Sequence, residues 1–90
     1  MIDLVGEPEL IHTFLEAYRG TDGVLYSVRV FGQGRADGTW IGWLDFTDPT
    51  GRVLKTDRET TQSSAAQVKY WAQGLETTYF DGALDRAKRG

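Results

Sequence analysis

The side chains that could do chemistry are few in this chain of 90 residues, and their spacing matches no catalytic arrangement. His12 is the only histidine, so a Ser-His-Asp triad or a multi-histidine metal site would have to be built around it. No nucleophile motif accompanies His12, which stands one residue from a predicted apolar stripe. We therefore expect a surface or boundary side chain rather than a catalytic base.

The acidic side chains also have plain structural explanations. Asp45, Asp48, Asp57 and Glu59 stand close together in the sequence, but their spacing matches no calcium-binding loop. They are better explained as a cross-strand partner, a turn residue and residues that lead into a helix. The hydroxyl-rich run 60–64 has no neighbouring base. We expect no catalytic residues, no metal and no cofactor.

A short glycine motif, Gly32-Gln33-Gly34, resembles part of a phosphate-binding loop. Such loops join a strand to the N-terminus of a helix, whereas these glycines end a predicted hairpin strand. The formal net charge of −3 and the pI near 5.0 also disfavour broad binding to a phosphate backbone, which needs clustered Lys and Arg. Nucleic acid is therefore the less favoured partner.

The elements that could position a binding surface are two β-hairpins between Val24 and Asp57. The first turn, Arg35-Ala36-Asp37-Gly38, fits either a two-residue Asp-Gly loop or a three-residue loop with Gly38 in the left-handed conformation. The choice decides which side chains share a face, since a shift of one residue flips a strand. The three-residue loop separates polar from apolar residues more cleanly, and we adopt it.

The second turn, Asp48-Pro49-Thr50-Gly51, has the preferences of a type I turn and supports the same register. It pairs Phe46 with Leu54 and Asp45 with Lys55. One face of the sheet then carries the apolar residues Tyr26, Val28, Val30, Leu44, Phe46 and Leu54. The other face carries a charge ladder, Arg29–Asp45–Lys55, beside Phe31, Ile41 and Trp43.

This second face is the candidate binding surface, formed by Arg29, Phe31, Ile41, Trp43 and Lys55. If helices cover only the apolar face, the three large apolar side chains expose on the order of 400 Å², within the range of patches that are often functional. The alternative is that the N-terminal part of the chain folds over this face and makes the aromatic residues part of the core.

An N-terminal helix is predicted over residues 8–19. Pro8 stands at its first position between two glutamates, where the helix dipole favours acidic residues. Apolar residues then follow at helical spacing, namely Leu10, Ile11, Phe14, Leu15 and Tyr18. Gly20 supplies the stop. The preceding run Met1–Val5 is either a small edge strand or a mobile terminus.

The C-terminal region is predicted to be helical. Residues 57–62 form a polar connector, and Ser64 with Gln67 makes a capping box that opens a helix. Gly74 interrupts the apolar stripe that follows. We favour a break there, with a second helical stretch that continues to Ala87.

These elements define an α+β fold with an N-terminal helix, a three-stranded antiparallel meander and a C-terminal helical region (αβββα or αβββαα) in two layers. Residues 1–90 form one domain, since a chain of this length supports one core. The sequence has no cysteine, which fits a reducing compartment, and no apolar run long enough to span a membrane. We expect a cytoplasmic protein.

A resemblance to known proteins covers roughly Tyr26–Leu84. It is carried by the runs YSVRVFGQGRADGTWIGWLDF, LKTDRETTQ and KYWAQGLE, which resemble a group of small bacterial proteins of unknown function. This resemblance implies a compact bacterial domain and no assigned activity. The order of the predicted elements is also similar to the double-stranded-RNA-binding domain and the HicB-type antitoxin fold. The lysine-rich helix start of RNA-binding members is replaced here by Ser63-Ser64-Ala65-Ala66-Gln67.

The function expected from the sequence is that of a non-enzymatic interaction module. It binds a protein partner, or a second copy of itself as a homodimer, through the open sheet face or an edge strand. The alternative is a single-stranded nucleic-acid-binding module, with Phe31 and Trp43 as stacking platforms beside Arg29 and Lys55. A small enzyme is the third hypothesis.

Overall fold

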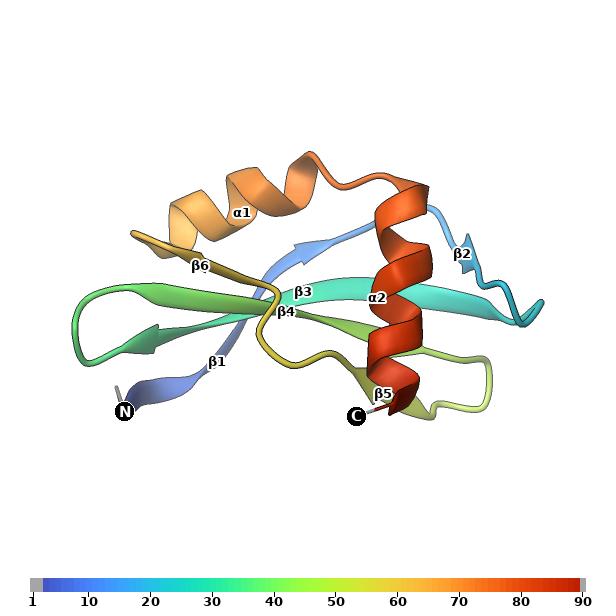
Figure 1. Cartoon of the computed structure of the whole chain (residues 1–90), viewed down its shortest axis with the longest axis horizontal. Coiled ribbons are helices and arrows are strands. Elements are labelled where there is room, and N and C mark those ends of the chain that lie inside the picture. Colours follow the sequence, from blue (N-terminus) through green and yellow to red (C-terminus); the bar gives the residue numbers. More distant parts are fainter. Residues whose placement is uncertain (1–2, 90) are drawn as a thin grey trace.

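The computed structural model describes residues 3–89, which form an antiparallel sheet with two helices on one of its faces (Figure 1). The elements in chain order are β1 (Leu4–Thr13), β2 (Tyr18–Arg19), β3 (Leu25–Arg35), β4 (Trp40–Thr47), β5 (Val53–Lys55), β6 (Thr60–Gln62), α1 (Ala65–Gln73) and α2 (Thr77–Arg89).

The sheet is built around the long hairpin of β3 and β4, which are its two central strands. β1 pairs with the outer edge of β3 along Arg29–Arg35, and β2 continues that edge at Leu25 and Tyr26. On the other side, β5 and β6 share the outer edge of β4. The path across the sheet is therefore β1-β3-β4-β5, with β2 and β6 extending its two edges.

The predicted N-terminal helix over residues 8–19 is wrong, because this part of the chain forms β1 and β2. The register of β1 against β3 shifts between Val5 and Glu9 and again between Leu10 and His12. Such bulges interrupt the alternation of a strand, so that apolar residues recur at a spacing that imitates a helix. The strand is favoured because it supplies hydrogen-bond partners to the outer backbone groups of β3, which a helix cannot do.

The predicted three-stranded meander is also wrong, since the described residues form six strands, although the α+β content is confirmed. The stretch 57–62, predicted as a connector, contains β6, which lies along β4. A strand of three residues is too short to show a periodic pattern. Of the run Met1–Val5, Leu4 and Val5 belong to β1, while residues 1 and 2 lie outside the described part.

Both turn predictions are confirmed. The Arg35 N–H donates to the Thr39 carbonyl at 2.8 Å, and Gly38 is left-handed with φ of 89°. Gly51 has the same role in the second loop, with φ of 91°. The predicted cross-strand register follows, with the pairs Val28–Phe46, Arg29–Asp45, Val30–Leu44, Phe31–Trp43, Asp45–Lys55 and Phe46–Leu54.

The core lies between the helices and the predicted apolar face of the sheet. It contains Tyr26, Val28, Val30, Leu44 and Phe46 from β3 and β4, and Val68, Ala72, Phe80, Ala83 and Leu84 from the helices. Gly42 allows α1 to approach closely, since a Cβ atom at this position would lie 2.8 Å from a methyl carbon of Val68. The side of the sheet that faces away from this core is therefore left without a helix.

The predicted helix signals in the C-terminal region are confirmed. Ser64 caps α1, and its Oγ accepts a hydrogen bond from the Gln67 N–H at 3.2 Å. Gly74 ends α1, and α2 begins at Thr77. The helical region is therefore interrupted at the predicted glycine. This break lets α2 turn across the sheet at a steep angle to α1 (Figure 1).

Candidate functional site

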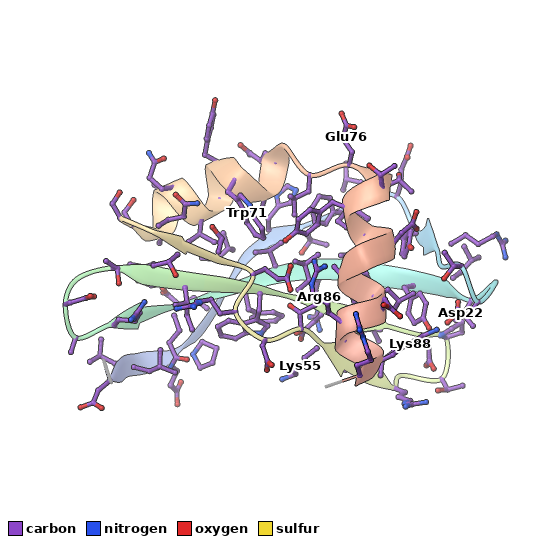
Figure 2. The ribbon with its side chains drawn as sticks, viewed as in Figure 1. Asp22, Lys55, Trp71, Glu76, Arg86 and Lys88 are labelled. Atoms are coloured by element: carbon purple, nitrogen blue, oxygen red, sulfur yellow. The ribbon has the colours of Figure 1, made fainter. Side chains whose placement is uncertain are left out.

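The candidate site is the face of the sheet that the helices leave uncovered, which we term the open face. Both helices lie on the other side of β3 and β4 (Figure 1). In Figure 2, Lys55 is seen below the central strands β3 and β4, whereas Trp71 of α1 lies above them. The even-numbered residues of β3 are buried towards the helices, so its odd-numbered residues, and those paired with them, line the open face.

The five residues predicted as a binding surface share the open face. They are Arg29 and Phe31 of β3, Ile41 and Trp43 of β4, and Lys55 of β5. The predicted alternative, in which the helix over residues 8–19 or the run Met1–Val5 folds over them, does not hold for the described residues, because 4–13 and 18–19 form strands at the sheet edge. Their role in binding stays a prediction.

The aromatic residues of the open face are already stacked on one another. The Phe31 and Trp43 rings have centroids 6.3 Å apart and an interplanar angle of 17°. The guanidinium carbon of Arg29 lies 5.2 Å from the centroid of the Phe31 ring. A flat guanidinium, a phenyl ring and an indole therefore form one cluster across the two central strands. Phe31 and Trp43 are both half-buried.

Asp45 is the most unusual residue of the open face. It is only 4% exposed, and its Oδ1 has no hydrogen-bond partner. The predicted charge ladder is correct in register, but within residues 3–89 no ion pair joins Asp45 to Arg29 or Lys55. Burial raises the pKa of Asp45, and the positive charges of Lys55 and Arg29 oppose this shift without cancelling it. The chain itself therefore does not fully neutralise this carboxylate.

Thr47 repeats the pattern two residues further along β4. Its Oγ1 is buried and has no hydrogen-bond partner, and it faces the same side as Asp45. Within the described part of the chain, these are the two buried side-chain oxygens that lack a partner. A buried polar atom without a partner costs about 1–3 kcal/mol. Both side chains are on the open-face side of β4, but neither atom is accessible from outside the chain.

Sequence reasoning missed the apolar residues that surround this centre. β1 places Leu10 beside Phe31, and the Leu10 side chain is 53% exposed. Val53 of β5, opposite Thr47, is another exposed apolar residue of the same face. Leu10 was missed because the predicted helix assigned it to a core-facing stripe. Val53 could have been found, since the register of the second turn already pairs it with Thr47.

A groove of about 770 Å³ lies elsewhere, between the β1–β2 connection and the start of α2. Its walls include His12, Phe14, Leu15, Tyr18, Thr77 and Phe80. The His12 ring packs edge-on against Phe14 with centroids 4.6 Å apart, and His12 is half-buried. This agrees with the prediction of a boundary side chain.

The predicted turn role of Asp48 is confirmed, whereas Glu59, predicted to lead into a helix, precedes β6 and binds side chains of α2. Glu59 accepts hydrogen bonds from Arg86 at 2.6 and 3.0 Å and from the Tyr79 hydroxyl at 2.5 Å. Burial, aided by the hydrogen bond to Glu59, raises the pKa of Tyr79 to about 12. Asp48 accepts from the backbone N–H of Thr50 at 2.9 Å within its turn. Glu59 thus attaches α2 to the segment that precedes β6.

No group of three or more His, Asp or Glu side chains in residues 3–89 is placed to hold a metal ion. In that same range, no helix has the length and apolar character needed to cross a membrane. Comparisons with protein-family models, with curated proteins and with solved structures each found no match to this chain. The assignment of a function therefore depends on the geometry of the open face.

Proposed function

We propose that this chain is a non-enzymatic interaction module that binds a protein partner through the open face of its sheet. The observation that carries the proposal is the stacked, half-buried pair of Phe31 and Trp43 at the centre of a sheet face that neither helix covers (Figure 1). A partner that covers this face buries both rings. The proposed location is the cytoplasm, which the cysteine-free sequence supports.

Exposed apolar side chains at the rim of the open face add to this support. Leu4 and Leu10 of β1, Leu25 of β3 and Val53 of β5 are 50%, 53%, 43% and 39% exposed, and their register positions place all four on this side. Contiguous apolar patches with a polar surround are typical of protein interaction sites. Aromatic residues and arginine, which occupy the centre here, are enriched among the residues that dominate binding energy.

The open face is a better candidate than the edge of the sheet. The outer edge of β1 contains Pro8 between Glu7 and Glu9, and the strand is interrupted near Gly6, which has φ of 70°. Proline, charged residues and bulges are the features by which proteins prevent another strand from adding to an edge. We therefore favour face-to-face binding over strand addition.

A single-stranded nucleic-acid-binding module is the second candidate, because Arg29 and Lys55 lie beside the aromatic rings. Base stacking needs a free ring face. Phe31 is already stacked against Trp43 and contacted by Arg29, which makes it a poor platform. A salt-dependent shift of labelled single-stranded RNA or DNA that Trp43→Ala abolishes would favour this candidate over protein binding.

The test of the proposed function is site-specific photo-crosslinking in cells that express the full chain. A photoreactive phenylalanine analogue replaces Trp43 on the open face in one variant and Tyr70 in the other. Tyr70 is a matched control, because it is an aromatic residue on α1 that is 75% exposed. We expect covalent protein adducts from position 43 and not from position 70. No adduct from position 43, or equal adducts from both, contradicts the proposal.

A further inference from the structure

We infer that the partner of the open face is an acidic amphipathic helix of another protein, an inference that rests on the proposed function. Arg29 and Lys55 carry the accessible charges at the centre of this face, and both are positive. Asp45 stands between them on β4 but is only 4% exposed. A partner therefore meets two cations, although the chain as a whole has a net charge of −3.

Neither cation has a carboxylate partner within the described chain. In residues 3–89, no ion pair includes Arg29 or Lys55, whereas cations of α2 do bind carboxylates. Arg29 lies over the Phe31 ring, and a guanidinium that stacks on a ring still directs its N–H groups outward in its own plane. These N–H groups form the paired donors that a carboxylate accepts best. The two cations therefore favour a partner that carries Asp or Glu.

Apolar and charged residues occupy adjacent rows across the strands. Leu10, Phe31 and Trp43 form one row, because they are cross-strand neighbours on β1, β3 and β4. Arg29 and Lys55 stand in the next row, two residues along the strands, which is a distance of about 7 Å. A partner that covers both rows therefore needs apolar side chains along one line and carboxylates along a parallel line.

An α-helix meets this requirement with its own backbone groups paired. A segment that lies on a sheet face finds no strand edge to pair with, so an extended chain would bury N–H and C=O groups without partners. A helix bonds these groups internally and presents a polar flank beside its apolar stripe. α1 and α2 already cover the opposite face of the sheet in this way (Figure 1). A helix of the partner adds the corresponding layer on the open face.

The spacing of the two cations fits such a helix. Arg29 and Lys55 are separated by β4, and strands about 4.8 Å apart place them about 10 Å apart. Residues i and i+7 of an α-helix are about two turns apart, a rise of about 10.5 Å. A helix that crosses the strands along the apolar row therefore places acidic residues at i and i+7 against Arg29 and Lys55.

Two other anionic partners fit this face less well. Single-stranded nucleic acid stacks its bases on free rings, whereas Phe31 and Trp43 are stacked on each other with 17° between their planes. An anionic membrane attracts clusters of about four to eight Lys or Arg, and the centre of this face offers two cations on a chain of net charge −3. The observations therefore favour a protein helix.

A charge reversal tests the inference in the cells that carry the photoreactive residue at position 43. Lys55→Glu places a carboxylate beside the apolar row and should lower the yield of protein adducts at least about tenfold, because like charges then meet. Lys69→Glu is the matched control, since Lys69 is an exposed lysine on α1, and it should leave the yield unchanged. An unchanged yield in Lys55→Glu overturns the inference.

A synthetic peptide repeats this test with the purified full chain. The probe is a helix-forming peptide of about 18 residues, long enough to be helical, with leucine along one stripe and glutamate at i and i+7 on one flank. In the control peptide, lysine replaces each glutamate. Fluorescence anisotropy should show at least about tenfold tighter binding of the glutamate peptide to the wild type, and Lys55→Glu should reverse this preference.

Circular dichroism establishes whether the variants fold. If Lys55→Glu does not fold, Lys55→Gln removes the charge alone and should weaken binding of the glutamate peptide about threefold. Equal affinity of the wild type for the two peptides overturns the inference. Binding of single-stranded DNA or of phosphatidylserine vesicles, without binding of the glutamate peptide, overturns it as well.

The outcomes separate this inference from the proposed function. Adducts from position 43 whose yield does not respond to Lys55→Glu overturn the acidic helix and leave the open face as a protein-binding site. Adducts that Lys55→Glu suppresses and Lys69→Glu does not support both. Absence of any adduct from position 43 overturns the proposed function itself.

Discussion

Arg29 and Asp45 stand directly opposite each other on β3 and β4, yet within the described residues they form no ion pair. Arg29 lies instead over the ring of Phe31, two residues along its own strand. The two alternatives differ little in free energy, since a cross-strand charge pair and an exposed cation–π contact are each worth less than about 1 kcal/mol. The cost falls on Asp45, which is left buried with an unpaired oxygen.

This arrangement predicts that Asp45→Asn stabilises the monomer at neutral pH, because burial disfavours the charged carboxylate of Asp45. The pKa of Asp45 is raised in the folded state, so folding favours the protonated carboxyl. Its contribution to stability is fully present below the unfolded pKa of about 4 and is lost as pH rises through the folded pKa. Asparagine carries no such charge.

Urea unfolding at low protein concentration, between about pH 4 and pH 7, measures this difference. The advantage of Asp45→Asn should shrink as pH falls, because wild-type Asp45 becomes protonated. Asp85→Asn, at an exposed position of α2, controls for the loss of one negative charge. Equal stability of the wild type and Asp45→Asn at neutral pH would contradict the prediction.

The hairpin of β3 and β4 could be predicted from the sequence because its turns determine its register locally. Gly38 and Gly51 occupy left-handed positions that other residues adopt only with strain, and each sits in a loop of three residues. From these two positions the register places Arg29, Phe31, Trp43 and Lys55 on one face.

The edges of the sheet could not be predicted in the same way. β1 and β6 form because the outer edges of β3 and β4 have backbone groups that need hydrogen-bond partners. The sequences of β1 and β6 themselves do not show this requirement. In β1, the bulge near Ile11 gives the apolar residues a helical spacing. The central residues of the open face were therefore predicted, but Leu10 at its rim was not.

The surroundings of two glycines predict opposite effects on stability when each is replaced by alanine. Gly42→Ala places a methyl group 2.8 Å from Val68, inside the core, and should destabilise the fold by about 1–3 kcal/mol. Gly82→Ala meets only the flexible end of Arg86, at 3.2 Å, and lies within α2. It should stabilise by up to about 1 kcal/mol, because alanine is the better helix former. Urea unfolding of the two variants gives both values, and destabilisation of similar size at both positions would refute the argument.

The Glu59 cluster predicts a measurable loss of stability when its carboxylate is removed. The Glu59 side chain is 6% exposed and accepts from both Arg86 and Tyr79. Glu59→Gln should cost about 1–2 kcal/mol, discounted because the Arg86 side chain is 45% exposed and partly screened by water. The comparison is Asp85→Asn, whose ion pair with Arg89 is exposed on both sides and should cost less than about 0.5 kcal/mol. If the two substitutions cost the same, Glu59 does not hold α2 to the sheet.

Substitution of Leu10 distinguishes a role of the open face in binding from a role in folding. Because 53% of the side chain is exposed, Leu10→Ser should lower the unfolding free energy by no more than about 1 kcal/mol. A partner that covers the open face buries the exposed part of Leu10 as well. Loss of this contact should weaken binding about fivefold, the equivalent of about 1 kcal/mol of apolar burial. The yield of protein adducts from a photoreactive residue at position 43 measures this change, with Tyr70→Ser on α1 as the control. If Tyr70→Ser lowers the yield as much as Leu10→Ser does, the partner does not bind through the open face.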